Sequence, residues 1–202
     1  MQTQKSVGQV DMARRVIVVV DLQNDYFPGG KLPLWNVDTA SGNAARVIAR
    51  AREEGTPVVH IRHEFPGPDA PFFVANTDGA RIHASVLPLA DERVILKHYP
   101  NSFRDTDLRE VLDGHGPQEV FILGAMTHMC IDATARAAAD FGYNVLVLHD
   151  ACATLDVTFG EHVVAAPQVQ AAFLGALANG YARLQSADDF LAAKTLDRAE
   201  TP

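Results

Sequence analysis

The chain has little cysteine, an excess of acidic over basic residues and no long apolar run. Two cysteines in 202 residues cannot build a disulfide framework, and a chain of this length does not need one, so free thiols are expected. A formal net charge of −8 argues against a nucleic-acid partner and against an anionic membrane surface. The N-terminal residues lack the apolar block of a signal peptide, and no segment has the length of a membrane span. We therefore expect a cytoplasmic protein.

Short apolar runs alternate with helical patterns along most of the sequence. Strands are predicted at 15–21, 57–63, 93–98, 119–123, 143–150 and 181–186, and helices at 38–55, 106–114, 127–141 and 168–180. Asp38 or Thr39 is expected to cap the first helix and Gly55 to end it. This alternation predicts a three-layer α/β/α, Rossmann-like fold with a mostly parallel six-stranded sheet. We expect a single domain spanning 1–202, with its core at about 15–193.

The segment 64–92 interrupts this alternation. It combines several prolines with aromatic and turn residues, and it shows little periodicity. A loop of this length inside a compact domain is usually functional or disordered. It is either a pocket wall, a surface excursion, or an oligomer contact through Phe72 and Phe73. It would also be long enough to bring His83 near His63.

Cys130 follows a buried strand and a tight loop, close to the start of a predicted helix. Thr127 is the expected N-cap, Cys130 is then at about the third helical position, and Gly142 provides the C-terminal stop. The unpaired N–H groups and the helix dipole at that end favour an anion, so we expect a lowered pKa for the Cys130 thiol.

Three reactive side chains follow the carboxyl ends of predicted strands. Asp21 ends the first strand, Lys97 lies at the end of the third, and Cys130 follows the fourth. Each alone has an ordinary explanation, as a capping carboxylate, a surface lysine or a small buried hydrophobe. Because carboxyl ends of parallel strands share one edge of the sheet, the three are expected to meet there. A base, a countercharge and a nucleophile are the parts needed for covalent catalysis.

The stretches "VVDLQNDYF", "LKHYPNSF" and "GAMTHMCIDATAR", in this order and at these separations, resemble the isochorismatase-like cysteine hydrolases. That family includes nicotinamidases and carbamoyl-amide hydrolases. The resemblance runs from about Arg15 to the last predicted helix. It implies that Asp21, Lys97 and Cys130 form a catalytic triad.

The resemblance also implies a mechanism. Cys130 would attack an amide-type carbonyl and form a thioester, while Asp21 would move the proton in both half-reactions. The backbone N–H groups of Met126 and Cys130 would bind the oxyanion, and the Ala125–Met126 peptide bond would be cis.

No metal or cofactor is implied. Nicotinamidases carry an Asp-x-His pair after the second strand, and here His63 and Phe65 stand in those places. His60 and His63 lie three apart on a strand and project to opposite faces, so they do not readily share one ion. No phosphate-binding or dinucleotide-binding glycine motif is present in the sequence.

Three functions remain open from the sequence. The first is an amide-type hydrolase that acts on a small molecule through Cys130, the second is an isochorismatase-type vinyl ether hydrolase in which Asp21 suffices, and the third is a thiol redox-responsive or binding protein. Cys152 is expected to be structural, with oxidative pairing to Cys130 as the alternative. The residues expected at the substrate pocket are Tyr26, Phe27, His63, Phe73 and His128, which suggest a flat, partly apolar substrate.

A homo-oligomer is expected from two features. The last predicted helix carries small residues around much of its surface, and the Phe72 and Phe73 segment is expected to expose apolar groups that a monomer should not leave in water.

Overall fold

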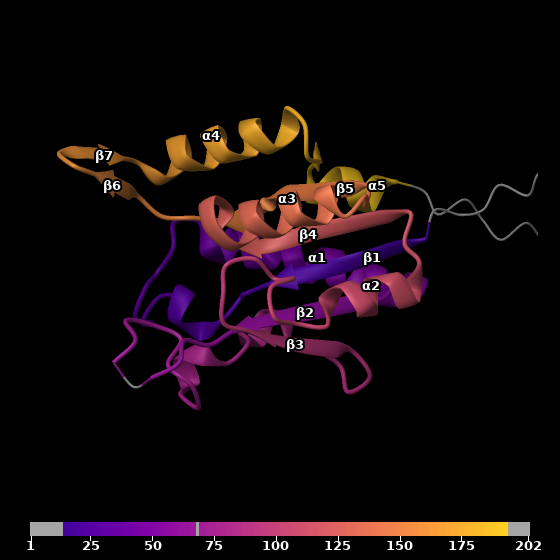
Figure 1. Ribbon diagram of the computed structural model, residues 1–202, viewed down its shortest axis with the longest axis horizontal. Helices are drawn as coiled ribbons and strands as arrows, with labels where there is room; N and C mark the ends of the chain where they lie inside the picture. The colour runs from indigo at the N-terminus through magenta and orange to yellow at the C-terminus, as the bar shows by residue number, and fades with distance from the viewer. Residues whose placement is uncertain (1–13, 68, 194–202) are drawn as a thin grey trace, which may run out of the picture.

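The computed structural model describes residues 14–67 and 69–193, and a six-stranded parallel sheet lies at its centre (Figure 1). The strand order is β3-β2-β1-β4-β5-β8, and every neighbouring pair is parallel. The strands are β1 (Arg15–Val20), β2 (Val58–His63), β3 (Arg93–Lys97), β4 (Glu119–Ala125), β5 (Val145–Ala153) and β8 (Arg183–Gln185). The predicted sheet is confirmed.

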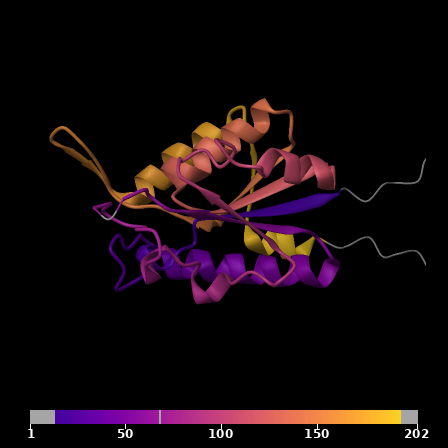
Figure 2. The ribbon, with the colours of Figure 1, turned by 60° about the horizontal axis from the view of Figure 1, so that its bottom comes forward.

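Helices cover both faces of this sheet. Figure 2 shows two helices, α1 (Val37–Glu54) and α5 (Ala187–Ala192), on one face and three, α2 (Leu108–His115), α3 (Asp132–Asp140) and α4 (Ala166–Ala178), on the other. Side chains of β1 alternate between the two layers, because Ile17 and Val19 pack on the α1 side while Val18 and Val20 pack on the α3 side. The three-layer α/β/α architecture is therefore confirmed.

The helix ends agree only in part with the sequence prediction. Gly55 and Gly142 have positive φ angles of 70° and 92°, as expected of glycines that follow a helix. The prediction of Asp38 or Thr39 as the cap of α1 is wrong. Asn36 is the N-cap, in a left-handed conformation with φ of 60°, and its side chain makes no capping hydrogen bond. Asparagine tolerates this conformation better than most residues, so α1 is capped two or three residues before the predicted position.

The excursion 64–92 packs against the body of its own subunit. It contains two short 3₁₀ turns, η2 (Asp78–Ala80) and η3 (Ala84–Val86). Phe73 is 0% exposed, and its ring lies 4.5 Å from that of Tyr26. The expectation that Phe72 and Phe73 are left in water is therefore wrong, because Phe73 is fully buried and Phe72 is partly buried against the same core.

A two-stranded hairpin between β5 and α4 was not predicted. Its strands β6 (Val157–Phe159) and β7 (His162–Val164) pair with each other, and the hairpin extends away from the sheet and helices (Figures 1 and 2). Phe159 at its tip is 83% exposed. Among the described residues, no helix is both long and apolar enough to cross a membrane.

Candidate active site

Asp21, Lys97 and Cys130 meet at the carboxyl edge of the sheet, as expected from their positions after strands. Asp21 directly follows β1, Lys97 ends β3, and Cys130 lies in the turn η4 (Thr127–Ile131) that follows β4. The Nζ atom of Lys97 lies 2.7 Å from Oδ2 of Asp21 and 3.2 Å from Sγ of Cys130. Their exposed fractions are 0%, 1% and 4% for Asp21, Lys97 and Cys130. The cluster is thus a buried group of a carboxylate, an ammonium and a thiol.

A close approach of β4 to β1 brings Cys130 towards Asp21. Gly124 has a φ of 124°, and a Cβ atom built on it would lie 2.0 Å from the carbonyl oxygen of Val20. Only glycine fits there, both for its conformation and for space. The Ala125–Met126 peptide bond, which follows directly, is cis.

The turn that carries Cys130 differs from the predicted helix start. Residues 127–131 form a π-helical turn that continues into α3, and Met126 rather than Thr127 precedes it. The Thr127 hydroxyl donates to Oε1 of Gln170 on α4 over 2.6 Å and lies 3.2 Å from the carbonyl oxygen of Ala153. Thr127 therefore does not cap a helix, and its hydroxyl links the turn that carries Cys130 to β5 and α4. Turns of this π type are frequent at functional sites.

The Lys97 ammonium has two further neighbours. Its Nζ atom lies 3.0 Å from Nδ1 of His63 and donates to the carbonyl oxygen of Tyr99 over 3.1 Å. One ligand atom each from Asp21, His63 and Cys130 lies within 4.8 Å of the others, which is a donor set that a metal ion such as zinc accepts. Because the ammonium is in contact with all three groups, an ion would have to compete with Lys97 for the same position.

The charges of Asp21 and Lys97 stabilise each other. Burial alone would raise the pKa of Asp21, but the Lys97 ammonium, together with the His63 ring 3.8 Å away, outweighs it, so this pKa lies below its ordinary value. Burial likewise opposes the charge on Lys97, and the Asp21 carboxylate together with Cys130 raises its pKa instead. Both groups are therefore ionised at neutral pH.

The expected lowering of the pKa of the Cys130 thiol is wrong. Burial and the nearby Asp21 carboxylate raise this pKa to about 12, although Lys97 pulls it downward. The sulfur is surrounded by protein and faces a fixed negative charge, and these effects exceed that of the helix start. In the resting site the proton is therefore on the sulfur, next to the ionised Asp21 carboxylate.

Two further residues of the stretch "DLQND" support the site, and sequence reasoning missed both roles. The buried Gln23 amide accepts the N–H of His63 over 2.7 Å and donates to the carbonyl oxygens of His63 and Ala80 over 2.8 and 2.9 Å. The Asp25 carboxylate accepts the N–H of Phe73 over 2.7 Å, and Phe73 has a left-handed φ of 51°. These bonds fix the excursion 64–92 over the edge where Asp21 lies. The alternating polar residues after β1 were the available signal.

Two of the expected pocket residues lie beside the cluster. Tyr26 is buried, and burial, followed by the charges of Cys130, Asp21 and Asp25, raises the pKa of its phenol well above the ordinary value. Its ring contacts Phe73, which in turn lies 6.1 Å from the ring of His63. Tyr26 therefore stays a neutral phenol close to the reactive sulfur.

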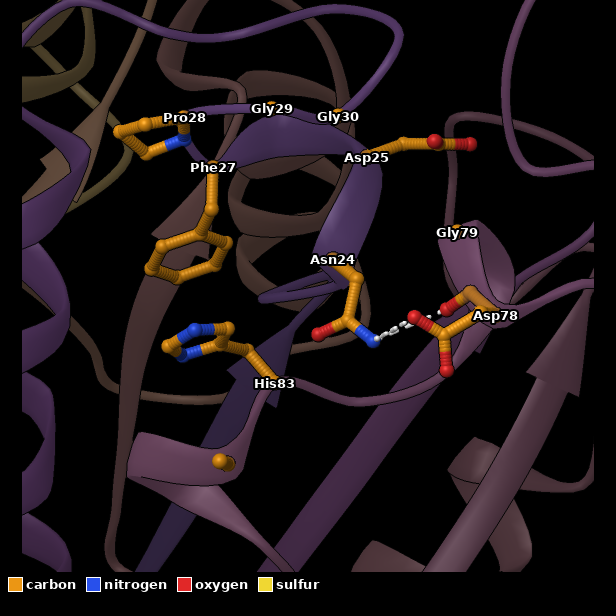
Figure 3. A pocket seen from close by; sticks show the side chains of 10 residues that line it. Asn24, Asp25, Phe27, Pro28, Gly29, Gly30, Asp78, Gly79 and His83 are labelled. Carbon is orange, nitrogen blue, oxygen red and sulfur yellow. Dashed lines mark hydrogen bonds between the residues drawn. The ribbon is translucent and has the colours of Figure 1, made fainter.

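Phe27 and His83 lie elsewhere. The two rings stack at 3.5 Å in a hollow of about 430 Å³ that is lined by none of Asp21, Lys97 and Cys130 (Figure 3). In Figure 3 Asn24 points across this hollow towards Asp78, to which it donates a hydrogen bond. The excursion thus takes His83 to Phe27 rather than to His63.

His128 lies in the same turn as Cys130, whereas Cys152 lies on the neighbouring strand β5. Nδ1 of His128 lies 2.6 Å from the hydroxyl of Thr154, its ring meets Phe173 of α4 edge-on at 5.8 Å, and burial lowers its pKa. Cys152 is fully buried within β5, where burial raises the pKa of its thiol to about 12. A buried, protonated thiol of this kind is inert.

Comparisons with known proteins agree with this architecture. The isochorismatase domain family model matches residues 15–186. The chain is 46% identical over 175 residues to the uncharacterized isochorismatase family protein YddQ of Bacillus subtilis, which covers 87% of this chain and 97% of that protein. It is 30% identical over 148 residues to the maleamate amidohydrolase of Pseudomonas putida, covering 66% of this chain and 70% of that protein. The crystal structure of an isochorismatase hydrolase from Oleispira antarctica matches with a TM-score of 0.87 and 49% identity, over 92% of this chain and 100% of that one. The chain therefore belongs to the isochorismatase family of hydrolases.

Proposed function

We propose that this protein hydrolyses an amide-type carbon–nitrogen bond of a small molecule through a thioester on Cys130. The observation that carries the proposal is the contact of one ammonium, that of Lys97, with both the Asp21 carboxylate at 2.7 Å and the Cys130 sulfur at 3.2 Å. This arrangement supplies a base, a nucleophile and a countercharge in one buried place. The relationship to a maleamate amidohydrolase supports an amide as the substrate class.

In the first half-reaction Asp21 takes the thiol proton as the sulfur attacks the carbonyl carbon. Because the pKa of the thiol is about 12, the thiolate does not accumulate beforehand, and proton transfer accompanies attack. The Lys97 ammonium keeps its proton and stabilises the negative sulfur. Asp21 then gives the proton to the departing nitrogen, the C–N bond breaks, and an amine and a thioester remain.

In the second half-reaction Asp21 is again a carboxylate and takes a proton from water. The hydroxide that forms attacks the thioester carbon, the C–S bond breaks, and the proton returns to the sulfur as the acid leaves. The negative oxygen in both steps is assigned to the backbone N–H groups of Met126 and Cys130. One carboxylate serves both steps, and the net reaction consumes one water.

The acyl part of the substrate is assigned to the aromatic wall beside the sulfur. Tyr26 and Phe73 form this wall, with the partly buried Phe72 ring 5.8 Å from that of Tyr26. Apolar rings favour a flat, partly apolar acyl group, and the neutral Tyr26 hydroxyl offers one polar contact. His128, a half-buried residue of the same turn as Cys130, is a second polar contact on the side of α4.

Substitution of the nucleophile tests the proposal. Cys130→Ala and Cys130→Ser should lose turnover of a panel of small carboxamides while melting within a few degrees of the wild type, since the side chain is small. Asp21→Asn should bind substrate without turnover, because the amide keeps the shape but does not accept the proton. Undiminished hydrolysis by Cys130→Ala would leave the thiol without its assigned role and favour acid catalysis of another bond.

We also propose that the protein is a homo-oligomer that associates through the hairpin and the outer face of α4. Phe159, Val163 and Val164 are exposed, and the sequence 162–182 contains no charged residue. A lone two-stranded hairpin is marginally stable in water, so a packing partner is expected for it. Light scattering should show an oligomer at micromolar concentration, and the double change Phe159→Ser, Val163→Ser should give monomers. A wild-type monomer would refute this assembly.

A further inference from the structure

The side chain of Gln170 connects the turn that carries Cys130 to two other elements of the fold. Gln170 lies on α4 and is partly buried. Its Oε1 atom accepts a hydrogen bond from the Thr127 hydroxyl over 2.6 Å. Its Nε2 atom donates to the carbonyl oxygens of His149 and Cys152 over 3.1 and 3.2 Å. One amide group therefore joins α4, β5 and the turn η4.

The chemistry of its partners fixes the orientation of this amide. Backbone carbonyl oxygens only accept hydrogen bonds, so the NH₂ group of Gln170 has to face His149 and Cys152. The Oε1 atom then faces Thr127, whose single hydroxyl proton is used in the shorter of its two contacts. All three bonds depend on the amide, because a hydrocarbon side chain of the same length makes none of them.

The two carbonyl partners of Gln170 lie at an irregularity in β5. The register between β4 and β5 shifts after the pair Ile122 and Val147 and resumes at the pair Gly124 and Cys152. β5 therefore bulges between these pairs, and the Gln170 amide bonds carbonyl oxygens inside the bulge and at its end. The helix α4 is thus fixed to the strand beside β4, and β4 is the strand that leads into η4.

A second side chain of α4 contacts the next residue of the same turn. Phe173 comes three residues after Gln170, so the two project from neighbouring positions on one face of the helix. The Phe173 ring meets the His128 ring edge-on at 5.8 Å. At the start of α4 the N–H of Ala166 donates to the Asp156 carboxylate over 2.8 Å. The helix is therefore held at its start and contacts two consecutive residues of η4.

Thr127 lies between the two N–H groups that are assigned to the oxyanion. It directly follows Met126 and precedes Cys130 by three residues. The carbonyl oxygen of Met126 accepts the N–H groups of Met129 and Ile131 over 3.0 and 3.2 Å, on either side of Cys130. These bonds hold the turn together internally, and the Thr127 hydroxyl bonds the turn to α4. A shift of Thr127 would therefore move both N–H groups relative to a substrate carbonyl.

We propose that Gln170 is a positioning residue that holds the N–H groups of Met126 and Cys130 in their oxyanion-binding positions through the Thr127 hydroxyl. This inference rests on the proposed function, because it requires an oxyanion to form beside Cys130. Removal of one oxyanion donor lowers kcat by about 10²- to 10³-fold, since such donors act on charge that develops during the reaction. A donor that is present but displaced should cost less, so loss of the Gln170 amide should lower kcat by about 10- to 100-fold.

Steady-state kinetics of matched variants test this link. Gln170→Met keeps the length of the side chain and removes its amide, and Thr127→Val keeps the shape and removes the hydroxyl. On the carboxamide that the wild type hydrolyses fastest, each should lower kcat by about 10- to 100-fold and leave KM within about threefold. The double variant should lose little more than either single variant, because both break the same link.

Two control variants separate positioning from a general loss of structure. Thr127→Ser keeps the hydroxyl and should stay within about threefold of the wild-type kcat. Gln168→Met changes an exposed glutamine on the same helix and should stay within about twofold. Thermal melting establishes that each variant is folded at the assay temperature. If Gln170→Met does not fold, the isosteric Thr127→Val carries the same expectation.

The affinity of Cys130 for an aldehyde tests the same link without turnover. The sulfur adds to the carbonyl carbon of benzaldehyde, the thiol proton passes through Asp21 to the carbonyl oxygen, and no group leaves. The oxygen of the resulting hemithioacetal occupies the position assigned to the oxyanion. Carbon-13 NMR with benzaldehyde labelled at the carbonyl carbon measures the dissociation constant. Gln170→Met and Thr127→Val should each weaken this adduct by about tenfold or more, and Gln168→Met should leave it within about twofold.

The outcomes of these experiments distinguish the positioning role from the proposed function. An unchanged kcat in Gln170→Met, a loss that appears in KM alone, or multiplying losses in the double variant would overturn the proposal. An aldehyde affinity in Gln170→Met equal to that of the wild type would overturn it as well. A hemithioacetal that weakens as expected, in a protein that hydrolyses no amide, would instead count against the proposed function alone.

Discussion

Replacing Lys97 with methionine should strongly destabilise the fold. Lys97 is 1% exposed and its partner Asp21 is 0% exposed, so the change leaves a carboxylate buried without its cation. Removing one member of a buried ion pair costs about 3 to 5 kcal/mol, because the remaining charge has lost both water and its partner. We expect a fall of this size in the free energy of unfolding at pH 8. Methionine nearly matches the length of the lysine side chain, so packing changes little.

This loss should depend on pH in a defined direction. In the wild type the pKa of Asp21 lies below its ordinary value, so the pair stabilises the fold above the unfolded pKa of about 3.9, and the stabilisation is lost as pH falls through the folded pKa. In Lys97→Met, burial dominates and raises the pKa of Asp21 above the unfolded value. The penalty is then complete at high pH and diminishes as pH falls through that raised pKa, where the carboxyl group becomes neutral.

Urea unfolding between pH 5 and 8 measures this effect. The double variant Asp21→Asn, Lys97→Met should recover most of the lost stability, because it leaves no charge behind. Lys31→Met, which removes an exposed ammonium, serves as the control and should change stability by less than about 0.5 kcal/mol. A loss below about 1 kcal/mol for Lys97→Met, or a loss that is the same at every pH, would refute the assignment of a buried ion pair.

Three other predictions concern the support of the site and its dependence on metal. Gly124→Ala should lower the stability of the fold, measured by thermal melting, by more than about 3 kcal/mol, because its Cβ would lie 2.0 Å from the carbonyl oxygen of Val20 at a φ of 124°. A variant as stable as the wild type would contradict that close contact. Gln23→Leu should lower the free energy of unfolding in urea by about 3 to 5 kcal/mol, because it unpairs three buried backbone groups of His63 and Ala80. The exposed control Gln118→Leu should be neutral, and equal effects of the two variants would contradict a structural role for the Gln23 hydrogen bonds. Prolonged treatment with a chelator should leave activity unchanged because Lys97 contacts all three possible ligands, and activity that zinc restores after chelation would contradict this.

The fold and the edge where reactive groups gather were predictable because both depend on local patterns. Apolar runs such as 16–20 and 120–123 have the length and composition of buried parallel strands, and the alternation of strands and helices favours a parallel sheet. Once the sheet is parallel, residues directly after strands must share one edge. The meeting of Asp21, Lys97 and Cys130 follows from that rule without any knowledge of side-chain contacts.

The path of the excursion 64–92 was not predictable, because distant residues determine it. Gln23 bonds groups 40 and 57 residues away, and Asp25 bonds Phe73 48 residues away. The residues of the excursion show no periodicity from which these hydrogen-bond partners could be predicted. Its aromatic residues therefore resembled an exposed contact surface, although Phe73 closes over its own subunit's site.

The protonation state of Cys130 shows a second limit of sequence reasoning. The position of a cysteine near a helix start favours a thiolate when solvent and dipole are the main influences. Here burial and the Asp21 carboxylate act in the opposite sense, and they raise the pKa of the thiol to about 12. Neither the depth of burial nor the proximity of Asp21 can be read from the residues next to Cys130. The α5 helix was not predicted, although Ser186 and Asp189, which form its capping box, are three residues apart in the sequence.

The most direct test of the central claim is the detection of an acyl group on Cys130. The protein is mixed with small carboxamides, quenched in acid within milliseconds to seconds, and examined as intact protein and as peptides by mass spectrometry. A transient mass increase equal to the acyl group, located on Cys130, absent from Cys152 and absent in Cys130→Ser, is the predicted result. Turnover of an amide with no acyl adduct at any time, or with turnover preserved in Cys130→Ser, would contradict the thioester mechanism.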